Sequence, residues 1–377
     1  MSKKELGQYF TINEDLQKFV FEKTQYKGQT LLEPSFGAGH LLRLFLNYDP
    51  NYPMVCCELD TTIKPCITFK NQEIIYGDFI QIVLNRRFKT IIGNPPYVKK
   101  EKNRNLYLQF IEKSINLLED DGELIFIVPS DFLKLTSAGE IIRKMITEGS
   151  FTDFLFPNNE KLFENSIVDV LIFRYQKGIK TNKCTYNGVE KQLQFNEGII
   201  TFSKPDNNTT TIDELFDCYV GFVSGRDEVF CNNLGKLSLL CDKDKVKNFI
   251  YIEKFPTGDT NIDNYLNSKK KELLDRKIRT FGDENWFEWG AIRNKTAIEE
   301  RLNRDCIYVR TMTRKTDVAF IGKVQFFGGG LLCLVPKVEG LDLETIVKRI
   351  NSSDVKQDYI YSGRFKIGQK QMRFIRV

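Results

Sequence analysis

Short apolar runs separated by helical patterns dominate the first half of the chain. Runs of this kind, bounded by glycine, proline or acidic residues, predict buried strands, which we expect at residues 30–34, 54–60, 73–76, 90–93, 123–129 and 168–175. Apolar positions at helical spacing predict helices over 41–46, 106–118 and 138–149. Strands that alternate with helices predict an α/β fold, with an open sheet and helices on both of its faces.

The pattern changes after Lys177. Residues 178–214 are polar and read as strand fragments plus an Asn/Thr-rich linker. From residue 220 onward the segments are short and rich in glycine, which predicts a mixed α+β domain. We therefore expect a first domain at 1–177, a connector at 178–219 and a second domain at 220–377.

Charge is distributed unevenly between the two parts of the chain. Residues 1–220 carry a formal net charge of −3, whereas residues 221–377 carry +8. An excess of positive charge confined to one half suggests a polyanionic partner for that half.

No apolar run approaches the roughly 18 residues that span a bilayer, and the N-terminus MSKKELGQYF lacks the apolar core of a signal peptide. We expect no membrane association and a cytoplasmic location, in a bacterium or in a virus-infected host cell.

Cysteine and histidine usage narrows the chemistry. Nine cysteines occur without a C-x-x-C pair, and His40 is the single histidine. We therefore expect reduced thiols and no metal site. A Ser-His or Cys-His mechanism is also disfavoured, because His40 would have to serve as the base.

Polar residues stand at the ends of four predicted strands: Glu33, Glu58, Asp78 and Asn94. In an open α/β sheet, ligands bind at the carboxyl ends of the strands, so we expect these side chains to line one crevice. Gly37 and Gly39 in the turn after the first strand allow a ligand to approach the backbone closely, and an acid about 20 positions later can accept hydrogen bonds from ribose hydroxyls. A carboxylate at Glu33 would repel a pyrophosphate but attract a sulfonium and an amino group. The pattern therefore favours S-adenosylmethionine over a dinucleotide.

The stretch GNPPYVKK, residues 93–100, suits the methylation of an aromatic amine. The Asn94 side-chain oxygen and the Pro95 carbonyl can each accept one N–H of the amine and so prepare its nitrogen to attack a methyl donor. Pro95 and Pro96 restrict the backbone so that this carbonyl is aimed in advance, and Tyr97 can stack on a base. Lys99 and Lys100 follow at a position where they could contact phosphate.

These motifs together resemble a known family. GQYFT (7–11), LEPSFGAGHLL (32–42), CELD (57–60), GDF (77–79), GNPPY (93–97) and NLYLQFIEKSINLLEDDGELIFIVPSDFL (105–133) occur in the order found in the gamma-class adenine-N6 DNA methyltransferases, and look most like their TaqI-type members. The resemblance covers roughly residues 1–177 and extends more loosely to 220–226 and 362–369. It implies a Rossmann-like S-adenosylmethionine-dependent methyltransferase domain followed by a target-recognition domain.

The resemblance also assigns roles to individual residues. It implies that Gln8, Tyr9 and Thr11 fold over the methionine end of the cofactor, near Glu33, Gly37 and Gly39. Glu58 would take the ribose hydroxyls and Asp78 the adenine amino group, while Phe79 and Phe110 line the adenine slot. Asn94 and Pro95 would hold the target amine, with Tyr97 on one side of the flipped base. The residue matching the second stacking ring is Phe163, for which a plain core position is the alternative interpretation.

The expected activity is methyl transfer to N6 of an adenine rotated out of a short double-stranded recognition site, which we expect to span four to six base pairs. Basic residues expected to contact DNA are Lys99, Lys100, Arg226, Arg310, Arg314, Lys315, Arg364 and Lys366. We expect a monomer whose cognate restriction endonuclease, if present, acts as a separate protein. NPPY also occurs in methyltransferases for rRNA bases and protein glutamine, so either substrate is the alternative.

Overall fold

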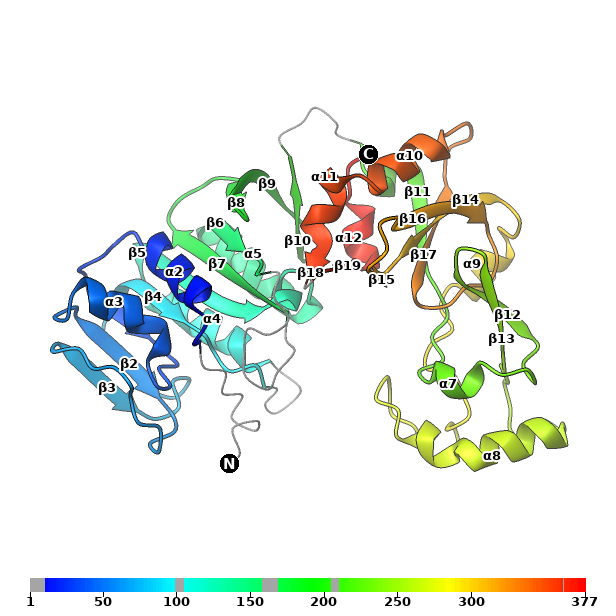
Figure 1. The fold of residues 1–377 in the computed structure, drawn as a ribbon, viewed down its shortest axis with the longest axis horizontal. Helices are drawn as coiled ribbons and strands as arrows, with labels where there is room; N and C mark the ends of the chain where they lie inside the picture. The colour runs from blue at the N-terminus through cyan, green and yellow to red at the C-terminus, as the bar shows by residue number, and fades with distance from the viewer. Residues whose placement is uncertain (1–10, 99–104, 158–168, 205–209, 362) are drawn as a thin grey trace. The chain divides into compact units, whose positions relative to one another are not determined.

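The computed structural model describes residues 11–98, 105–157, 169–204, 210–361 and 363–377. These residues divide into two compact units, whose chain segments can be followed by colour in Figure 1. Unit 1 comprises Met1–Asn207 together with Tyr361–Gly363, and unit 2 comprises Asn208–Ile360 together with Arg364–Val377.

The described part of unit 1 is built on one sheet of ten strands, ordered β10-β9-β8-β6-β7-β5-β4-β1-β2-β3. Neighbours among β1 to β5 pair in parallel, and β7 runs antiparallel to both β5 and β6. The strands are β1 (Leu31–Glu33), β2 (Met54–Glu58), β3 (Gln72–Tyr76), β4 (Phe88–Gly93), β5 (Leu118–Pro129), β6 (Gly149–Leu155), β7 (Val170–Lys177), β8 (Lys183–Tyr186), β9 (Val189–Asn196) and β10 (Ile199–Ser203).

Helices cover both faces of this sheet, as the sequence predicted. Among the described residues of unit 1, the helices are α2 (Glu14–Lys23), α3 (Arg43–Tyr48), α4 (Leu106–Leu117) and α5 (Gly139–Glu148), with short 3₁₀ turns at His40–Leu42, Ser130–Leu133 and Thr136–Ala138. Leu16 of α2 and Phe45 of α3 share one apolar cluster with Ile125 and Ile127 of β5. The alternate β5 residue Phe126 points to the opposite face, where its ring meets Phe173. Helices α4 and α5 contact the sheet on this second side through β5, β6 and β7.

Residues 183–203 differ from the predicted connector, because they form β8, β9 and β10 and extend the sheet of unit 1. Aromatic side chains attach these strands to the sheet: Phe156 stacks on Tyr186 with ring centroids 4.8 Å apart, and Phe154 meets Phe202 at 5.0 Å. In β9, VEKQLQFN, one face is polar and at least partly exposed. The strand therefore lacks the continuous apolar run that marks a buried strand. The sequence also did not predict strand β6.

A buried ion pair joins the middle of this sheet to the end of α2. Arg174 Nε on β7 donates to Glu123 Oε2 on β5 at 2.8 Å, and their side chains are 3% and 0% exposed. The other carboxylate oxygen accepts from the backbone N–H groups of Gln25 and Tyr26 at 2.9 and 3.2 Å, and from Thr90 Oγ1 at 3.1 Å. Glu123 thus connects β4, β5, β7 and the segment that follows α2.

Unit 2 contains a four-stranded sheet ordered β11-β17-β14-β16 and a separate two-stranded β12–β13 hairpin. Its strands are β11 (Phe216–Val220), β12 (Leu237–Asp242), β13 (Lys245–Phe249), β14 (Asp305–Arg310), β15 (Met312–Thr313), β16 (Ala319–Lys323), β17 (Leu331–Pro336), β18 (Ile360–Tyr361, whose last residue is assigned to unit 1) and β19 (Arg364–Lys366). Its helices are α6 (Ile212–Leu215), α7 (Asp227–Phe230), α8 (Thr260–Leu274), α9 (Lys295–Glu299), α10 (Leu343–Ile350), α11 (Ser353–Lys356) and α12 (Gln369–Arg373), with a 3₁₀ turn at Gln357–Tyr359.

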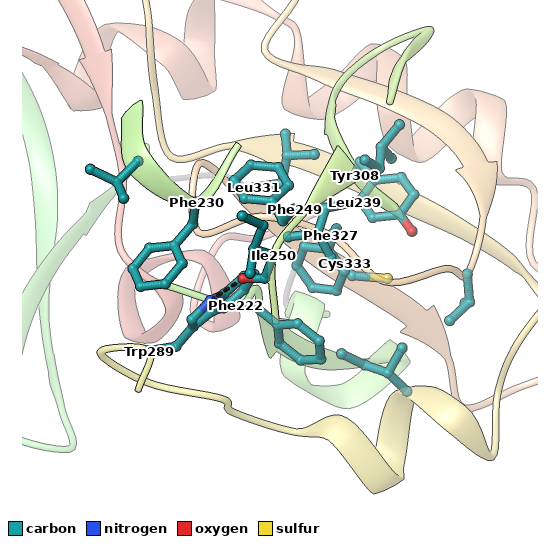
Figure 2. Packing of buried hydrophobic residues seen from close by; sticks show 14 of the residues in the cluster. Phe222, Phe230, Leu239, Phe249, Ile250, Trp289, Tyr308, Phe327, Leu331 and Cys333 are labelled. Carbon is teal, nitrogen blue, oxygen red and sulfur yellow. Dashed lines mark hydrogen bonds between the residues drawn. The ribbon is translucent and has the colours of Figure 1, made fainter. Parts of the chain in front are cut away.

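The core of unit 2 is rich in aromatic side chains (Figure 2). Trp289 lies among Phe222, Phe230 and Phe249, and its indole N–H donates to the carbonyl of Ile250 at 2.9 Å. A buried indole needs such a partner, because an unsatisfied N–H in an apolar core is costly. This core links the β12–β13 hairpin to the four-stranded sheet, which contributes Tyr308 and Cys333 to the same cluster.

Within the described ranges, no helix combines the length and the apolar character that crossing a membrane requires.

Candidate active site

The four parallel strands β3, β2, β1 and β4 are neighbours in the sheet, and their carboxyl ends lie at one edge. Glu33 is the last residue of β1 and Glu58 the last of β2, Asp78 lies two residues beyond β3, and Asn94 directly follows β4. The structure therefore brings these four predicted residues to the same edge of the sheet.

The turn after β1 holds the Glu58 carboxylate in place. Gly37 and Gly39 have φ values of 56° and 84°, a conformation that favours glycine. A Cβ at Gly39 would also come within 3 Å of the side chains of Ile67 and Phe36. The backbone N–H of Gly37 donates to Glu58 Oε2 at 2.6 Å, and that of Asp60 donates to Glu58 Oε1 at 2.8 Å. Glu58 is thus fixed at the end of β2, beside the glycine turn.

Glu33 is a buried carboxyl group at the centre of this edge. Its residue is 1% exposed, and its Oε1 accepts from Ser35 N at 2.9 Å and from Ser35 Oγ at 3.0 Å. Burial raises the pKa of Glu33 to about 8; the bonds from Ser35 oppose this effect, and the nearby charge of Glu58 adds to it. A cation beside Glu33 would favour its charged form.

Replacing Glu33 with glutamine is expected to change how stability depends on pH in the absence of cofactor. Below the ordinary pKa of 4.5 the carboxyl is neutral in both states, and above about 8 it is charged in both, so the cost of the buried charge develops as the pH rises through this window. The free energy of unfolding of Glu33→Gln should therefore exceed that of the wild type by a margin that grows with pH, measured by urea unfolding. Glu140→Gln, at an exposed position of α5, serves as the control. A margin that stays constant across the window would contradict the raised pKa.

Two rings lie beside Asp78. Phe79 and Phe110 are 2% and 6% exposed, with ring centroids 5.0 Å apart and an interplanar angle of 41°. Lys113 on α4 holds the chain after β3 by donating to the carbonyls of Phe79 and Ile80, the latter at 3.2 Å. Asp78 Oδ1 accepts from the N–H of Ile80 at 3.0 Å. This arrangement places a carboxylate next to an aromatic pair.

Asn94 is bound from both ends of its side chain. Its Nδ2 donates to Thr11 Oγ1 at 3.0 Å, and its Oδ1 accepts from the Tyr97 hydroxyl at 2.5 Å. The Tyr97 hydroxyl also lies 3.2 Å from the carbonyl of Ile127 on β5. Pro95 between them is buried and Pro96 is partly exposed. The NPPY segment is therefore folded against the sheet, with the Asn94 oxygen facing a hydrogen-bond donor.

Several predicted residues lie outside the described ranges: Gln8, Tyr9, Lys99, Lys100 and Phe163. Their proposed contacts with cofactor, phosphate and base stay predictions.

The structure changes the interpretation of Arg310, which the sequence suggested as a DNA contact. Arg310 is 6% exposed, and its guanidinium donates to Asp242 Oδ1 and to the carbonyl of Asp317. An arginine buried in this way serves the fold of unit 2, and we no longer expect it to contact DNA. Its pattern in the sequence, RTMTRK, is the same as that of a basic surface run.

The other predicted basic residues of unit 2 are more accessible. Arg314 and Lys315 are exposed, and Lys315 Nζ lies 2.5 Å from Asp242 Oδ2. Arg226 is partly buried at the start of α7, and Arg364 and Lys366 are partly exposed on β19.

Sequence reasoning did not single out the β12–β13 hairpin. Lys243, Lys245 and Lys247 are all exposed on it. Asp242, at the end of β12, is paired with both Arg310 and Lys315, so that its charge is already balanced. We call Lys243, Lys245, Lys247 and Lys315 the hairpin cluster. The segment DKDKVK could have revealed it, since three lysines alternate with other residues.

The structure offers no group of three or more histidine, cysteine, aspartate or glutamate side chains suited to a metal ion among the residues it describes.

Together, the strand order and the edge residues define a class of protein. The order β3-β2-β1-β4-β5-β7-β6, with β7 antiparallel, is that of class I S-adenosylmethionine-dependent methyltransferases, and unit 1 has this Rossmann-like fold. The described residues fit the cofactor: a fixed carboxylate at Glu58 can accept from two hydroxyls, the Phe79–Phe110 pair can pack against an aromatic ring, and a cation beside the buried Glu33 would favour the charged form of its carboxyl. The predictions of fold and cofactor are confirmed.

Comparison with known proteins shows which methyltransferases this chain is similar to. Residues 58–163 match the family model of the Eco57I restriction-modification methylase. The chain is 32% identical over 194 residues to the type II methyltransferase M.HincII of Haemophilus influenzae, covering 46% of this chain and 38% of M.HincII. It is 27% identical over 254 residues to M.AccI of Acinetobacter calcoaceticus, covering 59% and 43%. The chain thus spans less than half the length of these curated relatives.

A solved structure extends the likeness to unit 2. That of the type IIL restriction-modification enzyme MmeI in complex with DNA aligns with 98% of this chain and 68% of MmeI, with a TM-score of 0.56 and 10% identity, which shows a shared fold. The predicted resemblance to restriction-modification methyltransferases is confirmed. The gamma class and the preference for adenine stay predictions.

Proposed function

We propose that this protein is a site-specific DNA methyltransferase that transfers the methyl group of S-adenosylmethionine to N6 of an adenine in a short duplex site. The observation that carries the proposal is the Asn94 side chain, which is held at the carboxyl end of β4 with its oxygen facing a hydrogen-bond donor. The similarity to M.HincII, M.AccI and MmeI supports DNA as the substrate.

The proposed chemistry follows from the low nucleophilicity of an aromatic amine. Its nitrogen lone pair is delocalised into the ring, so the amine is a weak nucleophile. Asn94 Oδ1 and the Pro95 carbonyl, aimed by the proline backbone, would each accept one N–H and draw the nitrogen toward a pyramidal geometry. The methyl donor supplies an activated methyl group when it is bound, and this chain's residues orient the amine toward it.

The target base must leave the duplex before it can reach Asn94. Extrusion costs a few kcal/mol, which stacking and phosphate contacts must offset. The Tyr97 ring is the described candidate for stacking, and its hydroxyl would exchange its bond to Asn94 Oδ1 for another partner as the base arrives. Unit 2, with its positive charge, would hold the duplex.

Within unit 2, the hairpin cluster is our candidate for contact with the phosphate backbone. The hairpin is firmly mounted: Leu240 exchanges backbone hydrogen bonds of 2.9 Å with Phe326 and Gly328, and Asp242 is paired with Arg310 and Lys315. Figure 1 shows β12 and β13 as a ribbon distinct from the four-stranded sheet. A two-stranded ribbon is narrow enough to follow a major groove.

Replacing Lys243, Lys245 and Lys247 together with glutamine is expected to weaken binding to any duplex. Each lysine that neutralises a phosphate releases about one counterion, so the slope of log affinity against log salt should become shallower by about one per contact. Fluorescence anisotropy across a salt series measures this slope. The matched control is glutamine at Lys18, Lys70 and Lys180, exposed lysines of unit 1. An unchanged slope in the hairpin variant would remove the hairpin from the interface.

The proposed activity is tested by sequencing DNA from cells that express the protein, with modified adenines identified. One methylated motif of about four to six base pairs is the expected result. Methyl label on rRNA or on a protein glutamine, without modified adenine, would instead establish one of the alternative NPPY substrates and overturn the proposal.

We further propose that the protein acts as a monomer and that any cognate endonuclease is a separate protein. One chain already provides both a methyltransferase unit and a positively charged second unit, so neither requires a second copy. Light scattering of the protein with and without its DNA would measure the mass, and a dimer on a single site would contradict this proposal.

A further inference from the structure

Asn94 is tied to a distant part of the chain through Thr11. The Asn94 Nδ2 to Thr11 Oγ1 bond of 3.0 Å joins residues 83 positions apart in the sequence. Thr11 is 4% exposed and Asn94 is partly exposed, so the Thr11 end of this bond is buried. The resemblance assigned Thr11 to the cofactor, whereas its hydroxyl here holds the residue proposed to bind the target amine.

Thr11 is itself fixed by the helix that follows it. Gln17 on α2 is 1% exposed, and its Nε2 donates to the carbonyl oxygen of Thr11 at 2.7 Å. Asn13 caps the same helix by accepting from Leu16 N at 3.1 Å. The position of the Thr11 hydroxyl is therefore set by α2 and not only by its own side-chain rotamer.

In the structure these bonds accompany one direction of the Asn94 carboxamide, with Nδ2 toward Thr11 and Oδ1 toward Tyr97. A carboxamide presents an acceptor at one end and two donors at the other, and a half-turn about its last bond exchanges them. Only the acceptor end can take an N–H from an amine. With Nδ2 bound to Thr11, Oδ1 faces the other way, where it accepts from the Tyr97 hydroxyl.

We propose that Thr11 and Gln17 are positioning residues, which keep the Asn94 carboxamide turned so that its oxygen faces the target amine. The inference rests on the proposed function, because the direction of the Asn94 amide matters only if the substrate is an amine that donates an N–H to Asn94 Oδ1. Thr11 acts through Asn94, and Gln17 acts through Thr11.

The test compares Thr11→Val, which keeps the shape of the side chain without its hydroxyl, with Thr11→Ser, which keeps the hydroxyl. Loss of an orienting hydrogen bond of about 1–3 kcal/mol corresponds to a decrease in kcat of roughly 5- to 150-fold. We expect this decrease in Thr11→Val, with an unchanged KM for S-adenosylmethionine, and near wild-type kcat in Thr11→Ser. A smaller decrease is expected in Gln17→Met, and the two losses should not add in the double variant, because both act on one amide.

Several results would overturn the inference. An unchanged kcat in Thr11→Val would show that the hydroxyl does not matter, and a change in KM for S-adenosylmethionine alone would make Thr11 a cofactor contact. Equal losses in the valine and serine variants would indicate packing. If the wild type transfers no methyl group to DNA, the proposed function fails instead.

A second measurement needs no activity. The side-chain ¹⁵N–¹H resonances of Asn94, assigned by their loss in Asn94→Asp, should exchange slowly with solvent in the wild type and in Thr11→Ser. They should exchange faster in Thr11→Val. Equal exchange in all three proteins would show that Thr11 does not hold the amide.

Discussion

Asn94→Ala is expected to reduce kcat for methyl transfer by at least about 10²- to 10³-fold, the usual effect of removing one hydrogen-bonding group aimed at the transition state. Alanine removes the side-chain acceptor for the amine and leaves only the Pro95 carbonyl. Binding of S-adenosylmethionine should remain measurable by calorimetry, because Glu58 and the Phe79–Phe110 pair are unchanged. Single-turnover methylation of a duplex, with radiolabelled methyl donor, measures the chemical step directly.

The matched control for this variant is Asn116→Ala. Asn116 is exposed on α4, where its Oδ1 accepts from Lys144. The Asn116→Ala variant should methylate the duplex at the wild-type rate. Full activity in Asn94→Ala would exclude the NPPY asparagine from the chemistry.

Glu123→Ala is expected to lower the free energy of unfolding of unit 1 by about 3–5 kcal/mol, the cost of breaking a buried ion pair by removing one partner. The variant leaves the Arg174 charge buried, and it also removes the acceptor used by Gln25, Tyr26 and Thr90. Hydrogen exchange at the amides of β5 and β7 reports on this unit. Both tryptophans, Trp286 and Trp289, lie in unit 2, so their fluorescence follows the other unit in the same protein.

Two further variants distinguish the ion pair from a general effect of mutation. Glu112→Ala, at an exposed position of α4, should leave exchange unchanged. The double variant Glu123→Met and Arg174→Met should recover part of the loss, because no charge is then left unpaired. If the double variant loses as much stability as Glu123→Ala, the cost lies in the backbone acceptor and not in the charge.

The parallel part of the sheet was predictable from sequence for a physical reason. Most residues of β1, β2 and β4, and residues 122–128 of β5, are buried, so these strands read as short apolar runs. Strands β8 to β10 could not be recognised in this way, since one face of β9 carries polar residues such as Glu190 and Gln192. A pattern of buried residues finds β1 to β5 and β7, and misses β6 and β8 to β10.

The candidate site was predictable to the level of residue type and strand position. Glu33, Glu58, Asp78 and Asn94 lie at one edge because parallel neighbouring strands end there. The partners of these residues were not predictable. Gln17 reads as an ordinary polar residue of a helix, and only the fold shows that it is buried against Thr11. Arg310 is the opposite case: it stands in a basic run, which predicts a surface position, but it is buried.

The assignment of Tyr361 to unit 1 has a consequence for dividing this protein genetically. Its ring meets that of Phe156, with centroids 5.6 Å apart, and lies 5.2 Å from Lys134 Nζ, although the chain on both sides belongs to unit 2. A single cut near residue 207 would therefore leave the N-terminal fragment without the Tyr361 ring and its contacts with Phe156 and Lys134. We expect a split protein, or a chimaera that exchanges the second unit, to keep these contacts of unit 1 only if the incoming sequence carries a tyrosine at this point.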